Sequence, residues 1–357
     1  MRICQLLPTL SRGDAIGNEA VAIREMLKDA GYETGIYAER VDPRLPEETG
    51  YTYDRMPALT QEDILLYHLS TGSRLNRLMP SFGGRKVIRY HNITPPEFFK
   101  PYSPRAYKLG KRGYEEMRFL AGRAERVIAV SGYNRDQLRE NGYTCPIDVC
   151  PILIPYTDYD REPDPAIMAE SRETGLTNLL FVGRITPNKK QEDVIRAFYC
   201  YRKRYNVQSR LILAGNPAGM QRYDERLKAY VSELGLDGSV VFTGHTSFPE
   251  LLARYRTADV FVCMSEHEGF CVPMLEAMHF GKPIVAYRAA AIPDTVGKGA
   301  LLLDTKDPET AAAAIHRVLN DRDLRNALLV EQQKQLEKYS YDRVRKQLFT
   351  CLTGQEG

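Results

Sequence analysis

Short apolar runs alternate with stretches of helical periodicity along almost the whole chain. In the first part, strands are expected at residues 2–7, 32–38, 63–68, 86–91, 126–130 and 148–154. A second series is expected at 179–182, 210–214, 240–243, 260–264, 283–287 and 300–303. Strands that alternate with helices form parallel sheets with helices on both faces. The 357 residues are therefore expected to fold as two doubly wound α/β domains.

A polar loop, residues 265–271, follows the strand predicted at 260–264 and leads into a helix predicted from Val272. Ligands of open α/β sheets bind at the carboxyl ends of strands, and the first amides of a helix favour anions. Glu268 is expected in the loop and Glu276 about one turn into the helix, where their oxygens can accept hydrogen bonds from hydroxyl groups. The amides of Gly269, Phe270 and Cys271 are then available for a phosphate. Phosphate and hydroxyl groups together suggest a nucleotide sugar; the alternative is two solvated carboxylates at a helix start.

The segment Gly183-Arg-Ile-Thr-Pro-Asn-Lys-Lys190 leaves the strand predicted at 179–182 and enters a helix beginning near Gln191. Arg184 and Lys189 are thus expected at a carboxyl end of the same sheet, where a guanidinium and an ammonium can neutralise a diphosphate. Surface charges held in salt bridges are the alternative.

The complete pattern is more specific than its parts. It consists of Gly-Arg-x-x-x-x-Lys, then Ser-x-x-Glu-Gly-Phe-x-x-Pro-x-x-Glu-Ala-Met, then Gly-Lys-Pro-Ile-Val-Ala. With it, the chain resembles the retaining glycosyltransferases of family 4, which have the GT-B fold. The resemblance implies that Glu268 lies by the donor sugar and that Glu276 holds the ribose. Cys271 and Lys190 are departures, since glycine is common at both positions in the family.

The segment 10–19 contains Gly13 and Gly17, which allow a tight turn and close backbone approach before a helix predicted at 19–30, with Asn18 or Gly17 as its N-cap. The resemblance implies that this loop faces the donor diphosphate and the acceptor. We therefore expect Gly17 at the phosphate, with Asp14 and Asn18 towards the acceptor. A plain helix-start turn is the alternative.

His91 ends the strand predicted at 86–91, and prolines follow it. A lone histidine is more often a satisfied structural residue, but the resemblance implies a place beside the donor sugar. The other five histidines look scattered along the chain and predict no metal site.

The resemblance implies an acceptor-binding domain at 1–155, a nucleotide-sugar-binding domain at 156–340, and a helix at 341–357 that crosses back to the first. In the GT-B fold the two Rossmann-like domains face a central cleft. A stretch rich in proline and acid, 155–165, reads as the linker between them. The expected site residues are His91, Arg184, Lys189 and Glu268 for catalysis, Gly17, Gly183, Gly269, Phe270, Cys271, Val272 and Glu276 for the donor, and Asp14 and Asn18 for the acceptor.

The expected activity is that of a hexosyltransferase, which moves a sugar with retention from a UDP- or GDP-sugar to a hydroxyl of a glycan, lipid-linked or small-molecule acceptor. No metal or other cofactor is expected, and polysaccharide biosynthesis is the expected setting. Two alternatives are a nucleotide-sugar epimerase or hydrolase, and a non-catalytic nucleotide-sugar-binding regulatory subunit. The base, the sugar, the acceptor and the oligomeric state are not readable from the sequence.

Composition excludes some classes of protein. A net charge of +3 is too small to indicate nucleic acid as a partner, and the seven cysteines contain no Cys-x-x-Cys pair, which indicates reduced thiols. No apolar run is long enough for a membrane span, and the chain begins with a strand-like segment, so a cytoplasmic protein without a signal peptide is expected. Residues 105–126 carry a surplus of four positive charges with interleaved aromatics. They predict either a solvated helix face or a peripheral contact with the inner face of the membrane.

Overall fold

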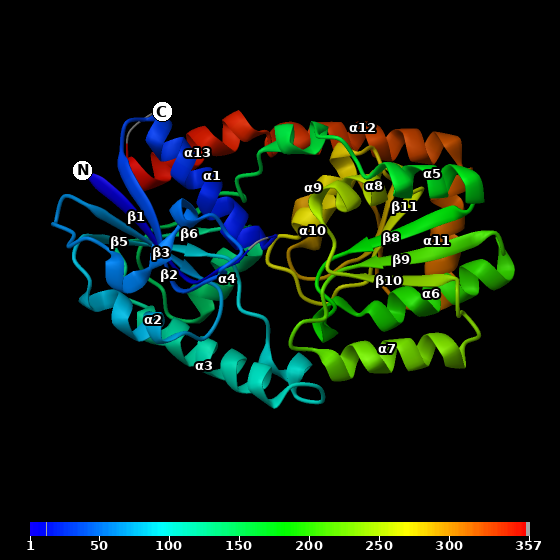
Figure 1. Cartoon of the computed structure of the whole chain (residues 1–357), viewed down its shortest axis with the longest axis horizontal. Helices are drawn as coiled ribbons and strands as arrows, with labels where there is room; N and C mark the ends of the chain where they lie inside the picture. The colour runs from blue at the N-terminus through cyan, green and yellow to red at the C-terminus, as the bar shows by residue number, and fades with distance from the viewer. Residues whose placement is uncertain (12, 355–357) are drawn as a thin grey trace. The chain divides into compact units, whose positions relative to one another are not determined.

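The structure is a computed structural model that describes residues 1–11 and 13–354. The chain divides into two compact units (Figure 1). The first contains Met1–Glu97, Arg105–Pro155 and the chain from Tyr339 onwards, and the second contains Phe98–Pro104 and Tyr156–Lys338. The segment Phe98–Pro104 therefore belongs to the second unit, although it lies within the range expected for the first.

The sheet of the first unit has seven parallel strands in the order β3-β2-β1-β4-β5-β6-β7. Their bounds are β1 Arg2–Leu10, β2 Glu33–Val41, β3 Tyr51–Thr52, β4 Ile64–Leu69, β5 Arg85–Tyr90, β6 Arg126–Ala129 and β7 Ile147–Val149. The strand order changes direction between β1 and β4. At such a switch point the loops after the two strands diverge to opposite faces and leave room for a ligand at the carboxyl edge.

Helices cover both faces of this sheet (Figure 1). On one face α1 (Ala15–Asp29) and α13 (Tyr341–Thr353) pack through Ile23, Leu27 and Leu348 onto strand residues that include Ile64 and Ile128. On the other face lie α2 (Arg74–Leu78), α3 (Pro104–Leu120) and α4 (Gly132–Glu140). Because both faces are buried, the central strands β1 and β4 are mostly apolar, whereas β2 nearer the sheet edge carries exposed charged residues.

The sheet of the second unit has six parallel strands in the order β10-β9-β8-β11-β12-β13, with its switch point between β8 and β11. Their bounds are β8 Thr177–Val182, β9 Ser209–Ala214, β10 Val240–Gly244, β11 Val260–Cys263, β12 Ile284–Tyr287 and β13 Leu301–Leu303. All six lie within three residues of the predicted strands. The apolar, β-branched runs therefore located the strands correctly.

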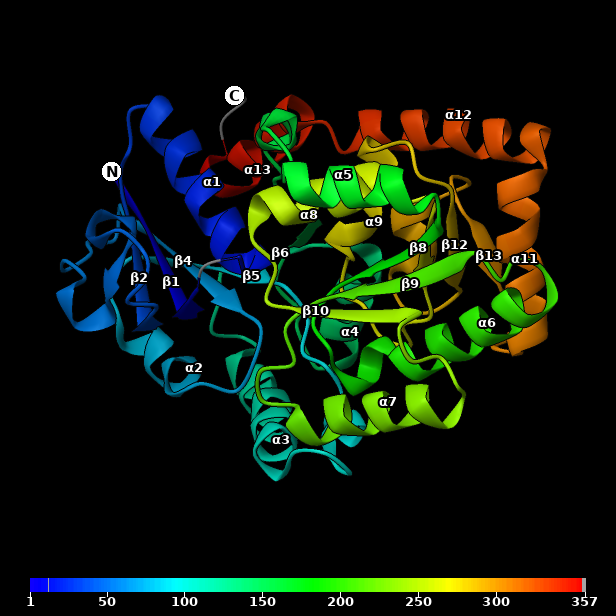
Figure 2. The same cartoon turned by 45° about the vertical axis from the view of Figure 1, so that its right-hand side comes forward.

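Figure 2 shows α6 and α7 on one face of this sheet and α5, α8 and α9 on the other. The helices of the unit are α5 Pro165–Thr174, α6 Gln191–Arg204, α7 Gln221–Glu233, α8 Phe248–Thr257, α9 Val272–His279, α10 Ile292–Val296, α11 Pro308–Asn320 and α12 Arg322–Lys338. Short 3-10 helices lie at η1 Glu47–Thr49, η2 Tyr53–Arg55, η3 Met79–Ser81, η4 Pro96–Phe99, η5 Tyr156–Asp160 and η6 Pro187–Lys189. Between residues 307 and 354 the chain is almost wholly helical, as predicted.

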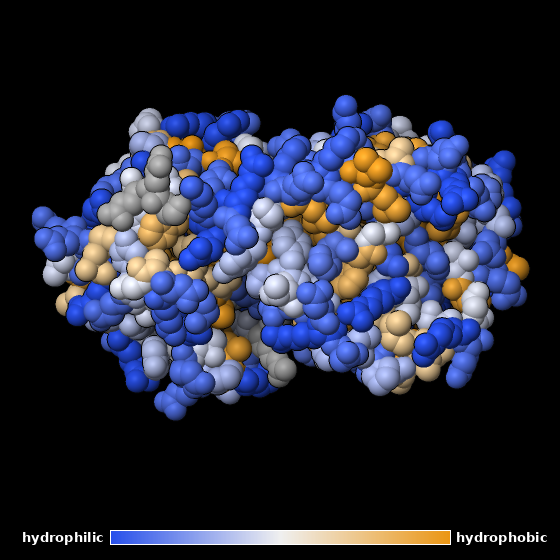
Figure 3. All heavy atoms as spheres, turned by 90° about the horizontal axis from the view of Figure 1, so that it is seen from above, coloured by the Kyte–Doolittle hydropathy of each residue, from blue (hydrophilic) through white to orange (hydrophobic). Residues whose placement is uncertain are grey.

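Hydrophobic side chains on the face seen in Figure 3 form small separate groups among hydrophilic ones. Within residues 1–11 and 13–354, no helix combines the length and the apolar character that a membrane crossing requires.

Candidate active site

The two motifs of the second unit meet at the switch point of its sheet. Residues 183–190 follow β8 and residues 264–271 follow β11, and these two strands are parallel neighbours. The Lys189 ammonium donates to both oxygens of Glu268, with Nζ to oxygen distances of 2.5 and 2.6 Å. Burial by itself lowers the pKa of Lys189, but the Glu268 carboxylate outweighs it and the pKa is raised. Lys189 therefore keeps its charge despite burial, and its ion pair with Glu268 spans 79 positions of sequence.

Asn188 and Glu266 hold the two loops together. The Asn188 side-chain amide donates to the His267 carbonyl at 3.0 Å, and the Glu266 amide donates to the Asn188 carbonyl at 2.9 Å. The Glu266 carboxylate is itself held by Lys306, at 2.5 Å, and lies 3.4 Å from Lys190. These contacts fix the backbone on both sides of the Lys189–Glu268 pair. Sequence reasoning missed Asn188 and Lys306, because neither residue carries a local signal of its role.

Glu276 lies in α9, as predicted, and both of its oxygens accept hydrogen bonds from tyrosines. Tyr159 donates to one oxygen at 2.8 Å and Tyr255 to the other at 2.6 Å. Burial raises the pKa of Glu276, while the two hydroxyl groups oppose part of the rise. Tyr159 belongs to η5, inside the stretch that the sequence indicated as a plain linker. The prediction of a linker was incomplete, because the proline and acidic residues of this stretch gave no sign that Tyr159 is buried against Glu276.

The backbone between Glu268 and α9 has an unusual conformation at Cys271, which precedes the helix. Its φ of +73° lies in the left-handed region that glycine adopts without cost. The Thr295 hydroxyl donates to the Phe270 carbonyl at 2.5 Å and anchors the loop. Among the described residues, the amides of Gly269 and Cys271 donate no hydrogen bond, and α9 begins at Val272. A helix start with unpartnered amides is a place where an anion binds favourably.

The turn after β8 is tight. Gly183 has a φ of +150°, and a Cβ on Gly215 would come within 1.8 Å of the Gly183 carbonyl oxygen. Arg184 is exposed, and its carbonyl accepts from the Gln191 side chain at 2.9 Å. Within the part of the chain that the structure describes, its guanidinium forms no ion pair. The structure thus brings Lys189 and Glu268 together, whereas Glu276 is hydrogen-bonded to two tyrosines and the Arg184 carbonyl to Gln191.

The loop of the first unit differs from its prediction. Helix α1 begins at Ala15 and its N-cap is Asp14, whose carboxylate accepts from the Gly17 amide at 3.3 Å. The prediction of Asn18 or Gly17 as the cap was wrong, because Asp14 accepts a hydrogen bond and both later residues already have helical backbone. Asn18 is exposed in the first turn of α1. A Cβ on Gly17 would come within 2.9 Å of the Ser11 carbonyl, which explains a glycine there.

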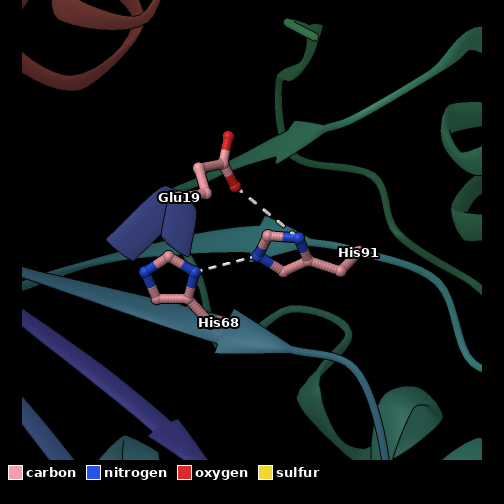
Figure 4. Close-up of side chains that lie close together, drawn as sticks. All are labelled: Glu19, His68 and His91. Carbon is pink, nitrogen blue, oxygen red and sulfur yellow. Dashed lines mark hydrogen bonds and ion pairs between the residues drawn. The ribbon is translucent and has the colours of Figure 1, made fainter. Parts of the chain in front are cut away.

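His91 lies just beyond β5, and its side chain is 3% exposed. Figure 4 shows its ring between the side chains of His68 and Glu19, with a dashed interaction to each. Its Nε2 lies 2.8 Å from Nδ1 of His68, and the two rings stack with centroids 5.1 Å apart. The other nitrogen of His68 lies 3.0 Å from the Gln5 side-chain oxygen. The Gln5 amide nitrogen donates to the Ala20 carbonyl at 2.8 Å. The Gln5 oxygen therefore accepts a hydrogen bond from Nε2 of His68, and Nδ1 of neutral His68 accepts one from Nε2 of His91.

Glu19 and Arg89 complete this network. Glu19 accepts from Arg89 at 2.5 Å, and Arg89 also donates to the carbonyls of Cys150 and Pro151 at 2.7 Å. The Glu19 carboxylate lies 3.6 Å from Nδ1 of His91, which is buried without a hydrogen-bond partner. Burial lowers the pKa of His91 well below its ordinary value, and Arg89 adds to the shift. The imidazole is therefore a neutral ring in the interior of the first unit.

The histidines are not all scattered, contrary to the expectation from sequence. Ligand atoms of Glu19, His68 and His91 lie within 4.8 Å of one another, although internal hydrogen bonds already occupy Glu19 and His68. A second such group is Cys263, Glu268 and Cys271 in the second unit. Sequence spacing does not reveal the first group, because Glu19, His68 and His91 come from three separate segments, whereas the second group lies within residues 263–271.

Comparison with known proteins identifies the family. Residues 165–342 match the family described as glycosyl transferases group 1. Through these residues, the chain belongs to that family. It is 34% identical over 196 residues to the D-inositol 3-phosphate glycosyltransferase of Corynebacterium jeikeium. The matched region covers 52% of this chain and 46% of that protein. It is 30% identical over 212 residues to the GDP-mannose-dependent alpha-(1-6)-phosphatidylinositol monomannoside mannosyltransferase of Mycobacterium tuberculosis, which covers 55% and 53%.

These matches span about half the length of the curated relatives. Solved structures cover the whole fold. Sucrose-phosphate synthase from Thermosynechococcus elongatus matches with a TM-score of 0.77 at 18% identity, over 98% of each chain. Anabaena HepE in complex with UDP-glucose matches with a TM-score of 0.78 at 17% identity, over 99% of this chain and 100% of the HepE chain. The fold is therefore GT-B, as the motifs had implied.

Proposed function

We propose that the protein is a retaining glycosyltransferase that moves a hexose from a nucleotide sugar to a hydroxyl group, without a metal. The observation that carries this proposal is the Lys189–Glu268 ion pair at the β8/β11 switch point. The pair places a cation and a carboxylate beside the amides at the start of α9. A departing nucleoside diphosphate gains negative charge, which nearby positive charge stabilises. The sugar ring gains positive charge, which a carboxylate stabilises, and a carboxylate can also accept hydrogen bonds from the sugar hydroxyls.

Lys189 and the α9 amides are the proposed ligands of the leaving diphosphate. The exposed Arg184 is the proposed second cation, since an exposed guanidinium can turn towards a bound phosphate and bind it through two hydrogen bonds. Glu276, already oriented by Tyr159 and Tyr255, is the proposed partner of the ribose hydroxyls. These groups supply the charge that a divalent cation supplies in other transferases.

Glu268 is proposed to face the sugar. Among the described residues Lys189 forms an ion pair with Glu268 and with no second carboxylate, which supports attack on the same face assisted by the leaving phosphate rather than a covalent intermediate. Gly17, Asp14 and Asn18 of the first unit remain proposed contacts of the diphosphate and the acceptor. His91 is proposed to act through its buried ring as a support for the backbone that follows β5.

The donor is proposed to be a UDP- or GDP-sugar. The mycobacterial relative is named as GDP-mannose-dependent, and the Anabaena structure holds UDP-glucose, which supports a nucleotide sugar without selecting the base. The acceptor is proposed to be a glycan or a lipid-linked sugar, because the same relative is named for a phosphatidylinositol mannoside.

The test is Lys189→Ala assayed with UDP- and GDP-sugars. We expect kcat to fall at least about 100-fold, because a charge that stabilises the leaving group is lost. The exposed Lys203→Ala variant, at the other end of α6, should keep wild-type activity. A Lys189→Ala protein that unfolds cooperatively at the wild-type temperature yet retains full turnover would overturn the proposal. If Lys189→Ala is unstable because Glu268 is left unpaired, the double variant Lys189→Met with Glu268→Gln removes both charges and must be equally inactive.

A further inference from the structure

The second unit contains two cysteines that converge on the carboxylate of the candidate active site. Cys263 is the last residue of β11 and Cys271 precedes α9. Their sulfurs and an oxygen of Glu268 lie within 4.8 Å of one another, and all three residues are buried. The Cys263 sulfur also lies 3.2 Å from the Ser265 hydroxyl. Nothing in the reaction proposed above uses either thiol.

We propose that Cys263, Cys271 and Glu268 form a binding site for a thiophilic divalent cation such as Zn²⁺, and that occupancy blocks the donor site. Two thiolates and a carboxylate are ligands that zinc accepts, and thiolates select zinc-like metals over magnesium or calcium. Bonds of about 2.3 Å at a tetrahedral angle put two sulfurs about 3.8 Å apart. The observed separations thus need to close by at most about 1 Å.

The backbone conformation at Cys271 is evidence that its thiol has a function. A φ of +73° costs a non-glycine residue free energy that glycine would avoid. The chain nevertheless has cysteine here, so the strained backbone is what aims the sulfur at Cys263. Strain of this kind persists at sites where the side chain has a function.

Charge balance also favours the site. Binding of a divalent cation by two thiols releases two protons, so the net charge of the pocket stays the same. Lys189 then loses its partner, because the Glu268 oxygens that it contacts at 2.5 and 2.6 Å become metal ligands. The side chain of Lys189 is 18% exposed, so the ammonium can swing towards solvent and open a path for the ion.

Inhibition by the metal rests on the proposed function, whereas binding of the metal does not. The primary test is therefore binding. The reduced, metal-free full-length protein is dialysed against Zn²⁺ for stoichiometry and titrated with Cd²⁺, whose thiolate complexes absorb in the ultraviolet. We expect one ion per chain and an absorbance change that saturates at one equivalent.

The matched variants are Cys271→Gly, Cys263→Ala and, as the control, Cys200→Ser. Glycine suits the backbone at position 271, so Cys271→Gly should fold even if Cys263→Ala does not. Loss of a ligand should weaken the affinity for zinc at least tenfold in both site variants, while Cys200→Ser, a half-buried cysteine of α6 in the same unit, should bind like the wild type.

Absence of saturable binding, or equal affinity in Cys271→Gly and wild type, would overturn the metal site. If the wild type binds one ion that Cys271→Gly does not bind, yet binding of UDP- and GDP-sugars is unaffected by Zn²⁺, the metal site stands and its link to the donor site fails.

Discussion

At the scale of single residues, environment determines the roles of residues that look alike in sequence. Glu268 and Glu276 are both buried glutamates of one motif, yet Glu268 pairs with an ammonium and Glu276 with two tyrosine hydroxyls. Lys190 and Cys271 occupy left-handed backbone positions, with φ of +51° and +73°. This conformation explains why the related motif commonly has glycine at both positions.

The buried histidines of the first unit should make its stability depend on pH. Burial lowers the pKa of both His68 and His91 well below 6.5, so below pH 6.5 the unfolded chain binds protons that the folded unit does not. Stability should therefore fall as the pH drops below about 6.5, by up to about 1.4 kcal/mol per pH unit for each histidine.

Hydrogen exchange in β4, followed between pH 7.5 and 5, measures this dependence. His68→Gln should reduce the dependence of stability on pH by about 1.4 kcal/mol per pH unit, because one of the two histidines with a lowered pKa is removed. His316→Gln in the second unit should leave it unchanged. Equal slopes for His68→Gln and the wild type would contradict the assignment of neutral buried rings.

At the scale of elements, helix α3 is divided between a buried and a charged face. Met117 and Leu120 are buried in the core of the first unit, while Arg105, Lys108 and Lys111 are exposed. Other cations of the basic stretch are already engaged; Arg112, for example, pairs with the buried Glu116 at 2.6 Å. Fewer positive charges are therefore exposed to a partner than the composition of the helix indicates. Arg105, Lys108 and Lys111 lie in its first two turns.

If this face meets an anionic membrane, the contact depends on those turns. The full chain should sediment with vesicles that contain phosphatidylserine at low salt and not with neutral vesicles. Lys108→Glu combined with Lys111→Glu should weaken binding by about 2 kcal/mol or more, which is roughly 30-fold. Lys203→Glu with Lys334→Glu, the same charge change on α6 and α12, should have no effect. Identical binding of both double variants would show that α3 is not the contact.

At the scale of the whole molecule, the chain does not complete its first unit until its last helix. After the second unit ends at Lys338, helix α13 packs Val344, Leu348 and Leu352 into the core of the first unit. The Gln347 side chain adds a hydrogen bond to the Val149 carbonyl at 2.7 Å. The core of the first unit therefore combines residues from both ends of the sequence.

Leu348→Ala should consequently destabilise the first unit, although the substitution lies close to the C-terminus. The side chain is fully buried, so we expect a loss of about 2–5 kcal/mol in the free energy of unfolding. Urea unfolding followed by hydrogen exchange in each unit measures it, and the exposed Lys346→Ala is the control. A loss confined to the second unit, or none, would mean that α13 does not stabilise the first.

The sequence by itself determined the fold class, nearly all the strands and the two motifs of the second unit. Apolar runs, helical periodicity and strand-end loops are local properties, and parallel strands necessarily gather their carboxyl ends at one edge. Proximity of Lys189 and Glu268 could therefore be predicted across 79 positions, and the structure confirms it.

Only the tertiary structure decided which polar and charged side chains form hydrogen bonds and ion pairs with one another. The Gln5–His68–His91 chain, the Glu19–Arg89 pair and the tyrosines on Glu276 each join residues from different elements, and the Cys263–Glu268–Cys271 group depends on how one loop folds back on itself. Their formation depends on strand register and side-chain packing, which single-sequence patterns do not encode. For the same reason the sequence placed His91 beside the donor sugar by resemblance and could not show that its ring is buried and neutral.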